Sequence, residues 1–334
     1  MRSVELNAFS TEPIWGSKLQ SHKKPVDVGD IPSKILEVIY KYLMTKFGDS
    51  NERISQGTPK FLSVISKFVA EKKTVQMCLP AFPWKSANKV YKVLGSLPDK
   101  AEEVALKRLN TMCEEIAEVY DPGATLIIIS DGLVYNDLLT IPDRDTWADL
   151  VSFPGLPAQL NEIIYVANAS NFRRYLLNKF GNDSLDVDNE IATKPDTNMT
   201  YRGYCRFLGN DLQYLYPVGK DRSGHAYRRD VKFLAKEMLK RGDAFAKAVK
   251  FAFPDHLRLS IHQSTGEHKI SVSLLPTDTG YTTPWHCSVA FRADGSITSG
   301  PKGDFEKDSN LELVYENGRP SYFQEKAAAG EAVN

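Results

Sequence analysis

The sequence predicts an α/β fold in which helices flank a parallel sheet and an antiparallel β-hairpin region follows near the C-terminus. Residues 124–129 form a continuous apolar run, as expected for a strand that is covered on both faces. Residues 75–79 form a second such run, and residues 99–120 between them have a helical pattern. A strand, a helix and a strand in this order make a parallel crossover unit, which is almost always right-handed. Farther on, residues 256–262 and 269–275 alternate between apolar and polar side chains, which is typical of half-buried strands.

The helix predicted between the two core strands has clear ends. Asp99 and Glu102 have the spacing of a capping box, and Asp121-Pro122-Gly123 stops the helix. Its apolar residues recur at helical intervals: Ala101, Ala105, Leu109, Met112, Ile116 and Val119. We therefore expect the polar segments around Lys85 and around Ser130-Asp131 to emerge at the same carboxyl edge of the sheet. Ligands bind at that edge in open α/β sheets.

Length and composition predict one large domain. At 334 residues and 42% hydrophobic content, the chain can bury a substantial core, and we expect a single domain over residues 31–323. Residues 1–30 are polar and interrupted by Pro and Gly, which predicts an extended arm, and residues 324–334 predict a disordered tail. The 42 basic and 42 acidic residues balance, which argues against a general binder of nucleic acid or of anionic membranes.

The absence of a targeting signal and the spacing of the cysteines indicate the cellular setting. The sequence has no basic-then-apolar leader and no apolar run of the ~18 residues that a membrane span needs. The four cysteines are scattered without zinc-type or redox-type spacing, so we expect buried free thiols. These features predict a soluble protein in the reducing cytoplasm.

The remaining segments complete the expected order of elements. Apolar periodicity predicts helices over residues 31–47, 59–72, 172–180 and 229–251, and further strands over residues 163–166 and 285–291. Residues 182–200 are rich in Asp and Asn and poor in large apolar side chains. We interpret that segment as a loop or a lid.

The alternating segment from His256 to His262 predicts a polar face. We expect an antiparallel hairpin with residues 269–275 across the loop 263–268, with Ile261 opposite Ile270. That register places cationic and hydroxyl side chains on one face of the hairpin. They are Arg258, Ser260, His262, Lys269, Ser271 and Ser273. Such a face is either exposed to solvent or lines a polar pocket, where it would bind an anion well.

Two side chains at the ends of the core strands are candidates for chemistry. Lys85 is either a surface lysine on a rigid turn or a partly desolvated ammonium that binds phosphate or moves a proton. Asp131 is either the cap of a helix or turn, or an acid–base group. A single histidine such as His286, which follows Pro284 and Trp285, would usually be structural.

Common cofactor motifs are absent from the sequence. It contains no G-x-G-x-x-G, no Walker loop, no H-E-x-x-H and no G-x-S-x-G. His262 lacks a carboxylate two positions on, so a two-His-one-carboxylate iron site is not indicated. We therefore expect an enzyme without a metal ion that works through Lys, Asp, Arg and His.

Several long motifs, in the same order along the chain, resemble the pyoverdine/dityrosine biosynthesis family. They are residues 82–90 (FPWKSANKV), 92–99 (KVLGSLPD), 130–137 (SDGLVYND), 141–143 (IPD), 258–262 (RLSIH), 283–286 (TPWH) and 318–322 (GRPSY). The similarity extends from about residue 30 to residue 323. That family includes isocyanide (isonitrile) synthases and the formyl-tyrosine-forming enzyme of the yeast spore wall. The chain has Leu133-Val134-Tyr135 where an Arg-Val-Phe version is familiar.

The resemblance implies a Rossmann-like α/β fold and a reaction. In that reaction, the α-amine of an amino acid condenses with the C2 ketone of ribulose 5-phosphate, and fragmentation of the sugar leaves one carbon on nitrogen as an isonitrile. Ribulose 5-phosphate is then a co-substrate, and no redox cofactor or metal is needed. We expect an isonitrile synthase of secondary-metabolite biosynthesis that binds small molecules and neither nucleic acid nor a membrane.

This reaction suggests a role for each candidate residue. Lys85 and Asp131 would face each other in one hollow and transfer protons, and His286 would supply a further donor. The predicted substrate-binding residues are Arg258, His262 and Lys269 for the phosphate or carboxylate, Ser86 and Ser130 for the sugar hydroxyls, and Trp285 for an aromatic amino acid. An aliphatic amino acid is equally permitted.

Two alternative functions stay open at this point. The N-formyl-tyrosine branch of the same family would release a hydrated product, and a non-catalytic relative would bind ligand without turnover. Some relatives also have an iron-dependent oxygenase domain that decarboxylates the product. We expect this chain to leave the carboxylate in place unless a separate oxygenase acts.

Overall fold

A computed structural model describes residues 31–44, 52–142, 160–163, 169–182, 184–214, 223–262, 269–277 and 279–327. The arm predicted at residues 1–30, the loop 263–268 and the last residues of the predicted tail lie outside the described residues, as does Asp143 of the Ile-Pro-Asp motif.

A five-stranded sheet forms the centre of the molecule, in the order β3-β2-β1-β4-β5, and every neighbouring pair is parallel. Its strands are β1 (Val75–Pro80), β2 (Ala124–Ile129), β3 (Leu160–Ile163), β4 (Leu257–Ser260) and β5 (Ile270–Ser271). Helix α3 (Lys100–Val119) connects β1 to β2, so the predicted strand–helix–strand unit is confirmed. Both hydrogen bonds of the predicted capping box, between Asp99 and Glu102, are also present.

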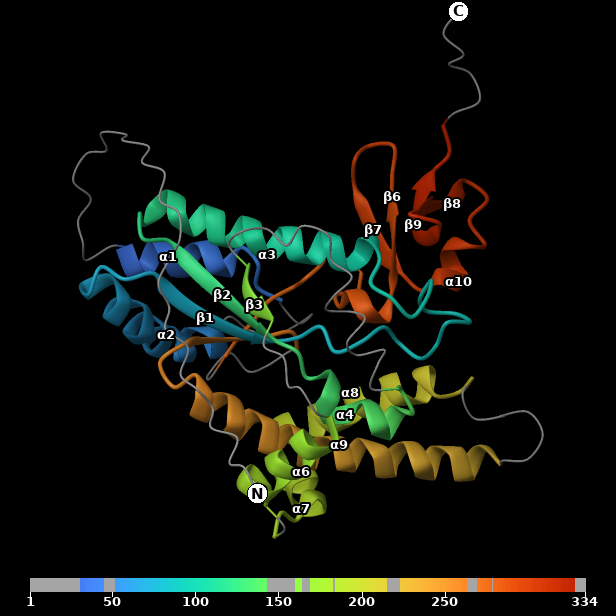
Figure 1. Ribbon diagram of the computed structural model, residues 1–334, viewed down its shortest axis with the longest axis horizontal. Helices are drawn as coiled ribbons and strands as arrows, with labels where there is room; N and C mark the ends of the chain where they lie inside the picture. Colours follow the sequence, from blue (N-terminus) through green and yellow to red (C-terminus); the bar gives the residue numbers. More distant parts are fainter. Residues whose placement is uncertain are drawn as a thin grey trace, which may run out of the picture.

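Helices cover both faces of this sheet, each set over its own apolar core (Figure 1). Helices α1 (Ile31–Tyr40), α2 (Glu52–Ala70) and α3 enclose one core. Helices α4 (Gly132–Tyr135), α6 (Ala169–Phe180), α8 (Pro195–Asp211) and α9 (Gly224–Ala252) enclose the other. Successive residues of β1 enter opposite cores: Met77 and Leu79 the first, Cys78 the second. Because both faces are buried, the strand has an uninterrupted apolar sequence.

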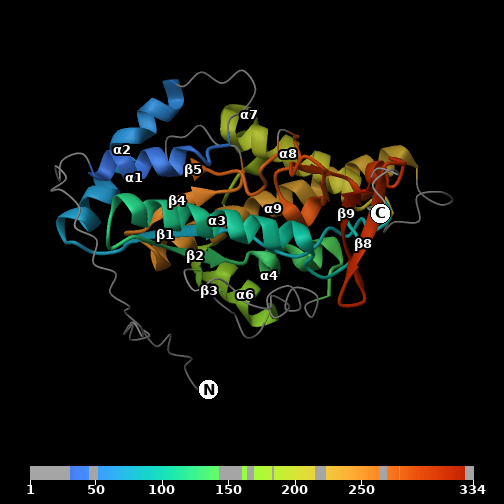
Figure 2. The same ribbon diagram turned by 90° about the horizontal axis from the view of Figure 1, so that it is seen from above.

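The C-terminal part of the chain forms a second sheet of four strands in the order β7-β6-β9-β8. Its antiparallel hairpins are β6 (Ser288–Phe291) with β7 (Ile297–Gly300) and β8 (Leu311–Glu316) with β9 (Arg319–Glu325), joined by parallel pairing of β6 and β9. This sheet lies beside one end of α3 (Figure 2). The predicted α/β fold with an additional hairpin region is therefore confirmed. Strand β9 ends at Glu325, within the segment predicted as a tail.

The predicted direction of one strand pair is wrong. β4 and β5 pair in parallel, with Leu259 beside Ile270 and Ser260 beside Ser271. Side chains alternate with a period of two in either direction, so the polar side chains of both strands still share one face. An alternating sequence fits a parallel pair as well as an antiparallel pair. The sequence pattern therefore could not distinguish the two directions.

The segment predicted as a loop at residues 182–200 is also different. It contains helix α7 (Val187–Thr193) and the start of α8. Asp186 caps α7, and Pro195 occupies the first turn of α8. These helices bury few residues and pack against each other and α9, so the apolar periodicity that marks a helix is sparse there.

Several other elements lie close to their predicted places. α2 begins at Glu52, α6 at Ala169 and α9 at Gly224, each earlier than the apolar pattern suggests. α1 ends at Tyr40, and β3 lies at Leu160–Ile163. The strand predicted from residue 285 begins at Ser288, because Pro284–His286 form a single 3-10 turn (η2). The remaining short elements are η1 (Asn136–Leu139) and α10 (Lys302–Phe305).

Candidate functional site

A cavity of about 310 Å³ lies at the carboxyl ends of β1, β2 and β4. The strand ends contribute Pro80, Asp131 and Ser260 to its wall, and α8 and α9 contribute Tyr204 and Gly242. The cavity therefore occupies the edge of the sheet at which the sequence predicts a ligand site.

Asp131 contributes to this cavity a carboxyl group with few polar partners. It occupies the N-cap position of α4, but its side chain makes no cap hydrogen bond. Its Oδ1 is buried and has no hydrogen-bond partner among the described residues. Burial raises the pKa of this carboxyl to about 7, with a backbone hydrogen bond opposing the shift only in part. The interpretation of Asp131 as a helix cap is therefore wrong, and its titration near neutral pH suits acid–base chemistry.

Three of the predicted cations, Arg258, His262 and Lys269, line the same cavity. The Nε of Arg258 is buried without a hydrogen-bond partner in the described part of the chain, and its Nη1 donates a long bond of 3.4 Å to the carbonyl of Ala246. Burial, followed by repulsion from Arg258, lowers the pKa of Lys269. Burial, followed by repulsion from Lys269, lowers the pKa of His262. Because the pKa of His262 is about 4, this side chain is neutral at neutral pH, and the positive charge of the cavity comes from Arg258 and Lys269. Their charge in a confined space favours an anionic ligand.

The helices contribute acids and hydroxyls to the cavity wall. These residues are Glu190 of α7, Asp196, Thr197 and Thr200 of α8, and Asp243 of α9. Carboxylates and hydroxyls accept hydrogen bonds from an ammonium group. The cavity thus presents groups for both charges of an amino acid.

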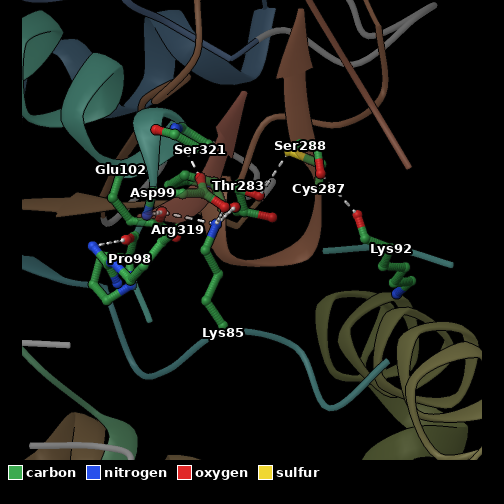
Figure 3. Close-up of polar contacts among 12 residues, drawn as sticks. Lys85, Lys92, Pro98, Asp99, Glu102, Thr283, Cys287, Ser288, Arg319 and Ser321 are labelled. Carbon is green, nitrogen blue, oxygen red and sulfur yellow. Dashed lines mark hydrogen bonds and ion pairs between the residues drawn. The ribbon is translucent and has the colours of Figure 1, made fainter. Parts of the chain in front are cut away.

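Lys85 is not among the residues that line the cavity with Asp131, and its ammonium group points to Asp99 and Glu102 (Figure 3). Its side chain is fully buried, and its Nζ lies 2.9 Å from Asp99 and 2.8 Å from Glu102 at the start of α3. The same Nζ donates to the carbonyl of Pro284 at 3.1 Å. Burial lowers the pKa of the ammonium, but the two carboxylates outweigh burial and raise it. The prediction that Lys85 and Asp131 share one hollow is wrong, because Asp99 and Glu102 hold the ammonium group and only Asp131 lines the cavity.

Asp211, at the end of α8, is a buried carboxylate that sequence reasoning missed. Its Oδ2 accepts a hydrogen bond from Ser86 Oγ at 2.7 Å and lies 3.3 Å from Nδ1 of His286, and its Oδ1 pairs with Lys92. Burial raises the pKa of Asp211, but His286 and Lys92 outweigh burial and hold it at about 2. Figure 3 shows the Lys92 side chain pointing away from the Lys85 cluster. Lys92, and not Lys85, is therefore the ammonium that meets α8.

Aromatic rings connect Asp211 and its partners to the cavity. The His286 ring lies 5.3 Å from Phe207, Phe207 lies 5.8 Å from Tyr204, and Tyr204 lies 6.3 Å from His262. Tyr204, Phe207 and Asp211 follow one another at helical spacing of three and four on α8. That spacing is the sequence signal that could have identified them as one functional face.

Ser130 and Trp285 lie outside the lining of the cavity and have other partners. Ser130 Oγ donates to the carbonyl of Phe82 at 3.0 Å, directly after β1, where Phe82 has a left-handed φ of 57°. Trp285 is buried and its ring lies 5.3 Å from that of Phe82. Both residues therefore hold the strained turn after β1 in place.

The Asp211 cluster leads to a prediction about stability. Replacing Asp211 by Asn should lower the free energy of unfolding by about 3–5 kcal/mol at neutral pH, because Lys92 would lose its buried counter-charge. The folded-state pKa of Asp211 lies below 3.8, so its stabilisation is present above that pH and is lost as the pH falls through about 2. Urea unfolding at neutral pH and near pH 2 measures both effects, and the difference between the two proteins should shrink in acid.

The control for this experiment is Glu71→Gln, which removes an exposed ion pair with Lys73. It should leave the free energy of unfolding nearly unchanged, because solvent screens an exposed ion pair. An Asp211→Asn protein as stable as wild type at neutral pH would contradict the role given to Asp211.

The cysteines are free, as predicted, and Cys78, Cys113 and Cys287 are buried. Among the residues that the structure describes, no group of three or more His, Cys, Asp or Glu side chains is arranged to hold a metal ion. None of the described helices combines the length and the apolar character needed to cross a membrane.

A parallel sheet with an acid, cations and a tyrosine around a cavity at its carboxyl edge defines an α/β protein suited to a small polar ligand. The family model described as "Pyoverdine/dityrosine biosynthesis protein" matches residues 65–152 and 148–314. The chain belongs to this family, which confirms the resemblance found in its motifs.

Similar proteins include isocyanide synthases of a fungus and of bacteria. The isocyanide synthase-NRPS hybrid crmA of Aspergillus fumigatus is 53% identical over 321 residues, which are 89% of this chain and 20% of that protein. Isocyanide synthase xanB of the same fungus is 39% identical, over 88% of this chain and 42% of the relative. The L-tyrosine isonitrile synthase of Xenorhabdus nematophila is 29% identical, over 89% of this chain and 92% of the relative.

A solved structure has the same fold. The crystal structure of PvcA from Pseudomonas aeruginosa matches with a TM-score of 0.79 and 27% sequence identity, covering 89% of this chain and all of that one. The chain therefore spans less than half the length of the two fungal relatives named above, and the whole of the PvcA chain.

Proposed function

We propose that this chain forms an isonitrile on the α-amine of an amino acid, with ribulose 5-phosphate as the carbon donor. The observation that supports it most strongly is one cavity that combines an acid titrating near neutral pH with a cationic wall. The names of its relatives, which are isocyanide and isonitrile synthases, support isonitrile formation.

The charges of the cavity suit the two substrates. Arg258, His262 and Lys269 would bind the phosphate of the sugar or the carboxylate of the amino acid. Asp196 and Glu190 would attract the ammonium group of the amino acid. Binding both substrates in one cavity would place the amine next to the C2 ketone and remove most of the entropic cost of their meeting.

Proton transfer is the chemistry that the protein would then supply. Asp131 would exchange protons as the amine adds to C2 and water leaves, which gives an imine. His286, whose Nδ1 lies 3.3 Å from the Asp211 carboxylate, would serve as a second proton carrier, although it lies beside Phe207 and not in the lining of the cavity. Cleavage of the C1–C2 and C2–C3 bonds would then leave C2 on nitrogen as the isonitrile. The electron pair of the C1–C2 bond would stay on C2, and C1 would leave as an aldehyde after its hydroxyl gives up a proton. The pair of the C2–C3 bond would leave with C3, which takes up that proton in the three-carbon phosphate. No third molecule gains or loses electrons in this scheme, so the proposal includes no redox cofactor.

An isotope-labelled assay tests the proposal. The protein is incubated with each of the twenty amino acids and with ribulose 5-phosphate labelled with ¹³C at C2, and products are followed by mass spectrometry and ¹³C NMR. We expect one amino acid, or a few, to give a product whose isonitrile carbon has the label.

The other outcomes of this assay identify the alternatives. A labelled N-formyl amino acid would assign the chain to the formyl-tyrosine branch. Thermal stabilisation by ribulose 5-phosphate without any product would indicate a binding protein. Either result would contradict isonitrile formation.

A further inference from the structure

Two tyrosine hydroxyls meet at one point in the wall of the cavity. The interaction of the two hydroxyls acts to raise the pKa of Tyr135 of α4 and to lower that of Tyr204 of α8, as expected if Tyr135 is the donor to Tyr204. Both hydroxyls lie against Gly242 of α9: a Cβ atom at residue 242 would be 3.1 Å from Tyr135 Oη and 3.8 Å from Tyr204 Oη. Tyr135 is buried, whereas Tyr204 and Gly242 line the cavity. Three separate helices therefore converge to place the Tyr204 hydroxyl.

A neighbouring ion pair fixes this arrangement. Arg241, the residue before Gly242, donates from Nη1 to the carbonyl of Val134 at 2.9 Å and to Asp137 at 2.6 Å. These bonds tie α9 to the short helix that contains Tyr135. A glycine in a helix interior costs helical propensity, so the close approach of the two hydroxyls gives position 242 a reason to be glycine.

The tyrosine pair lies within electrostatic range of Asp131. Burial, and then the charge of Asp131, raises the pKa of Tyr204 to about 12, although the hydrogen bond from Tyr135 lowers it. Tyr204 therefore stays protonated at any working pH, and Asp131 keeps its proton up to about pH 7. Two neutral hydrogen-bond donors in a confined cavity are well suited to stabilise an oxygen on which negative charge develops.

Resting on the proposed function, we infer that Tyr204 is a catalytic residue that donates a hydrogen bond to the C2 oxygen of the sugar, to which Asp131 gives its proton. Tyr135 and Gly242 are positioning residues, because they act only through the hydroxyl of Tyr204.

The step in which these residues act is the addition of the amine. The nitrogen forms a bond to C2, and the second electron pair of the C2=O double bond moves onto oxygen. That oxygen takes the proton of Asp131, and the nitrogen returns one proton to the Asp131 carboxylate. The resulting carbinolamine contains all the atoms of the amine and the ketone, and neither is oxidised or reduced. Tyr204 keeps its proton throughout, and the bond from Tyr135 polarises its O–H further.

Four variants, assayed with the substrate pair found by the isotope experiment, test this inference. Tyr204→Phe should lower kcat by about 10²–10³-fold with little change in KM, because it removes one donor to the developing oxyanion. Tyr135→Phe should lower kcat by less than about tenfold, because Tyr204 keeps its hydroxyl. Gly242→Ala should lower kcat no more than Tyr135→Phe does, because its methyl group crowds the Tyr135 hydroxyl at 3.1 Å and only touches that of Tyr204 at 3.8 Å. Gly203→Ala, at an exposed position of α8 with open space around it, should leave kcat unchanged.

A fifth variant separates chemistry from folding. Tyr204→3-fluorotyrosine keeps the shape of the side chain but makes the hydroxyl more acidic, so kcat should change although the melting temperature does not. If the 3-fluorotyrosine protein has the same kcat as wild type, the inference is overturned. A Tyr204→Phe protein that keeps more than a tenth of the wild-type kcat would overturn it as well. If wild type itself forms no isonitrile, the proposed function fails, and the inference fails with it.

Discussion

Replacing Asp131 by Asn is expected to lower kcat for isonitrile formation by about 10²–10⁴-fold. Asn has the same shape and can still donate a hydrogen bond, but it has no carboxyl proton to give or to take back. In wild type, kcat should fall above about pH 7 as Asp131 ionises, and the residual rate of the variant should lack this dependence. Steady-state kinetics from pH 5 to pH 9 measures both effects.

The same substitution should make the protein more stable at alkaline pH. The pKa of Asp131 is about 7 in the folded state against 3.8 for an ordinary Asp, so the folded protein binds this proton more tightly. The stability of wild type should therefore decrease as the pH rises from about 4 to about 7, and the variant should lose less over that range. Urea unfolding at pH 5 and pH 8 checks this result. A variant that keeps its activity, or that is less stable than wild type at pH 8, would contradict the role of Asp131.

Replacing Lys85 by Met should lower the free energy of unfolding by about 3–5 kcal/mol at pH 8. The side chain of Lys85 is fully buried, and its removal leaves the carboxylates of Asp99 and Glu102 together in the interior without a counter-charge. Burial already raises the pKa of Glu102 to about 7, although Lys85 opposes the shift. Without Lys85, the pKa of Glu102 should rise further, so the loss of stability should be smaller at pH 5, where Glu102 can take up a proton.

Two further variants make this prediction sharper. Adding Glu102→Gln to the Lys85→Met protein should recover part of the lost stability, because one of the two buried charges disappears. Lys41→Met, which breaks an exposed ion pair with Glu115, should cost less than about 1 kcal/mol. Urea unfolding of all four proteins provides the comparison. If Lys85→Met unfolds like wild type yet loses all turnover per folded molecule, Lys85 is catalytic and its structural role is refuted.

The sequence by itself determined the features that depend on neighbours a few residues away. The apolar runs of β1 and β2 and the capping box of α3 are such local patterns, and all are present in the structure. Alternation in β4 placed Arg258 and His262 on one polar face, and both line the cavity. The motifs also identified the family correctly.

The tertiary structure alone decided which distant groups meet. Lys85 and Lys92 are seven residues apart, yet one binds the acids of α3 and the other binds Asp211 of α8. Tertiary structure also decides the direction of the β4–β5 pair and brings two tyrosines together at Gly242. An ion pair or a close approach depends on which side chains folding brings within a few ångströms, and no local pattern records that distance.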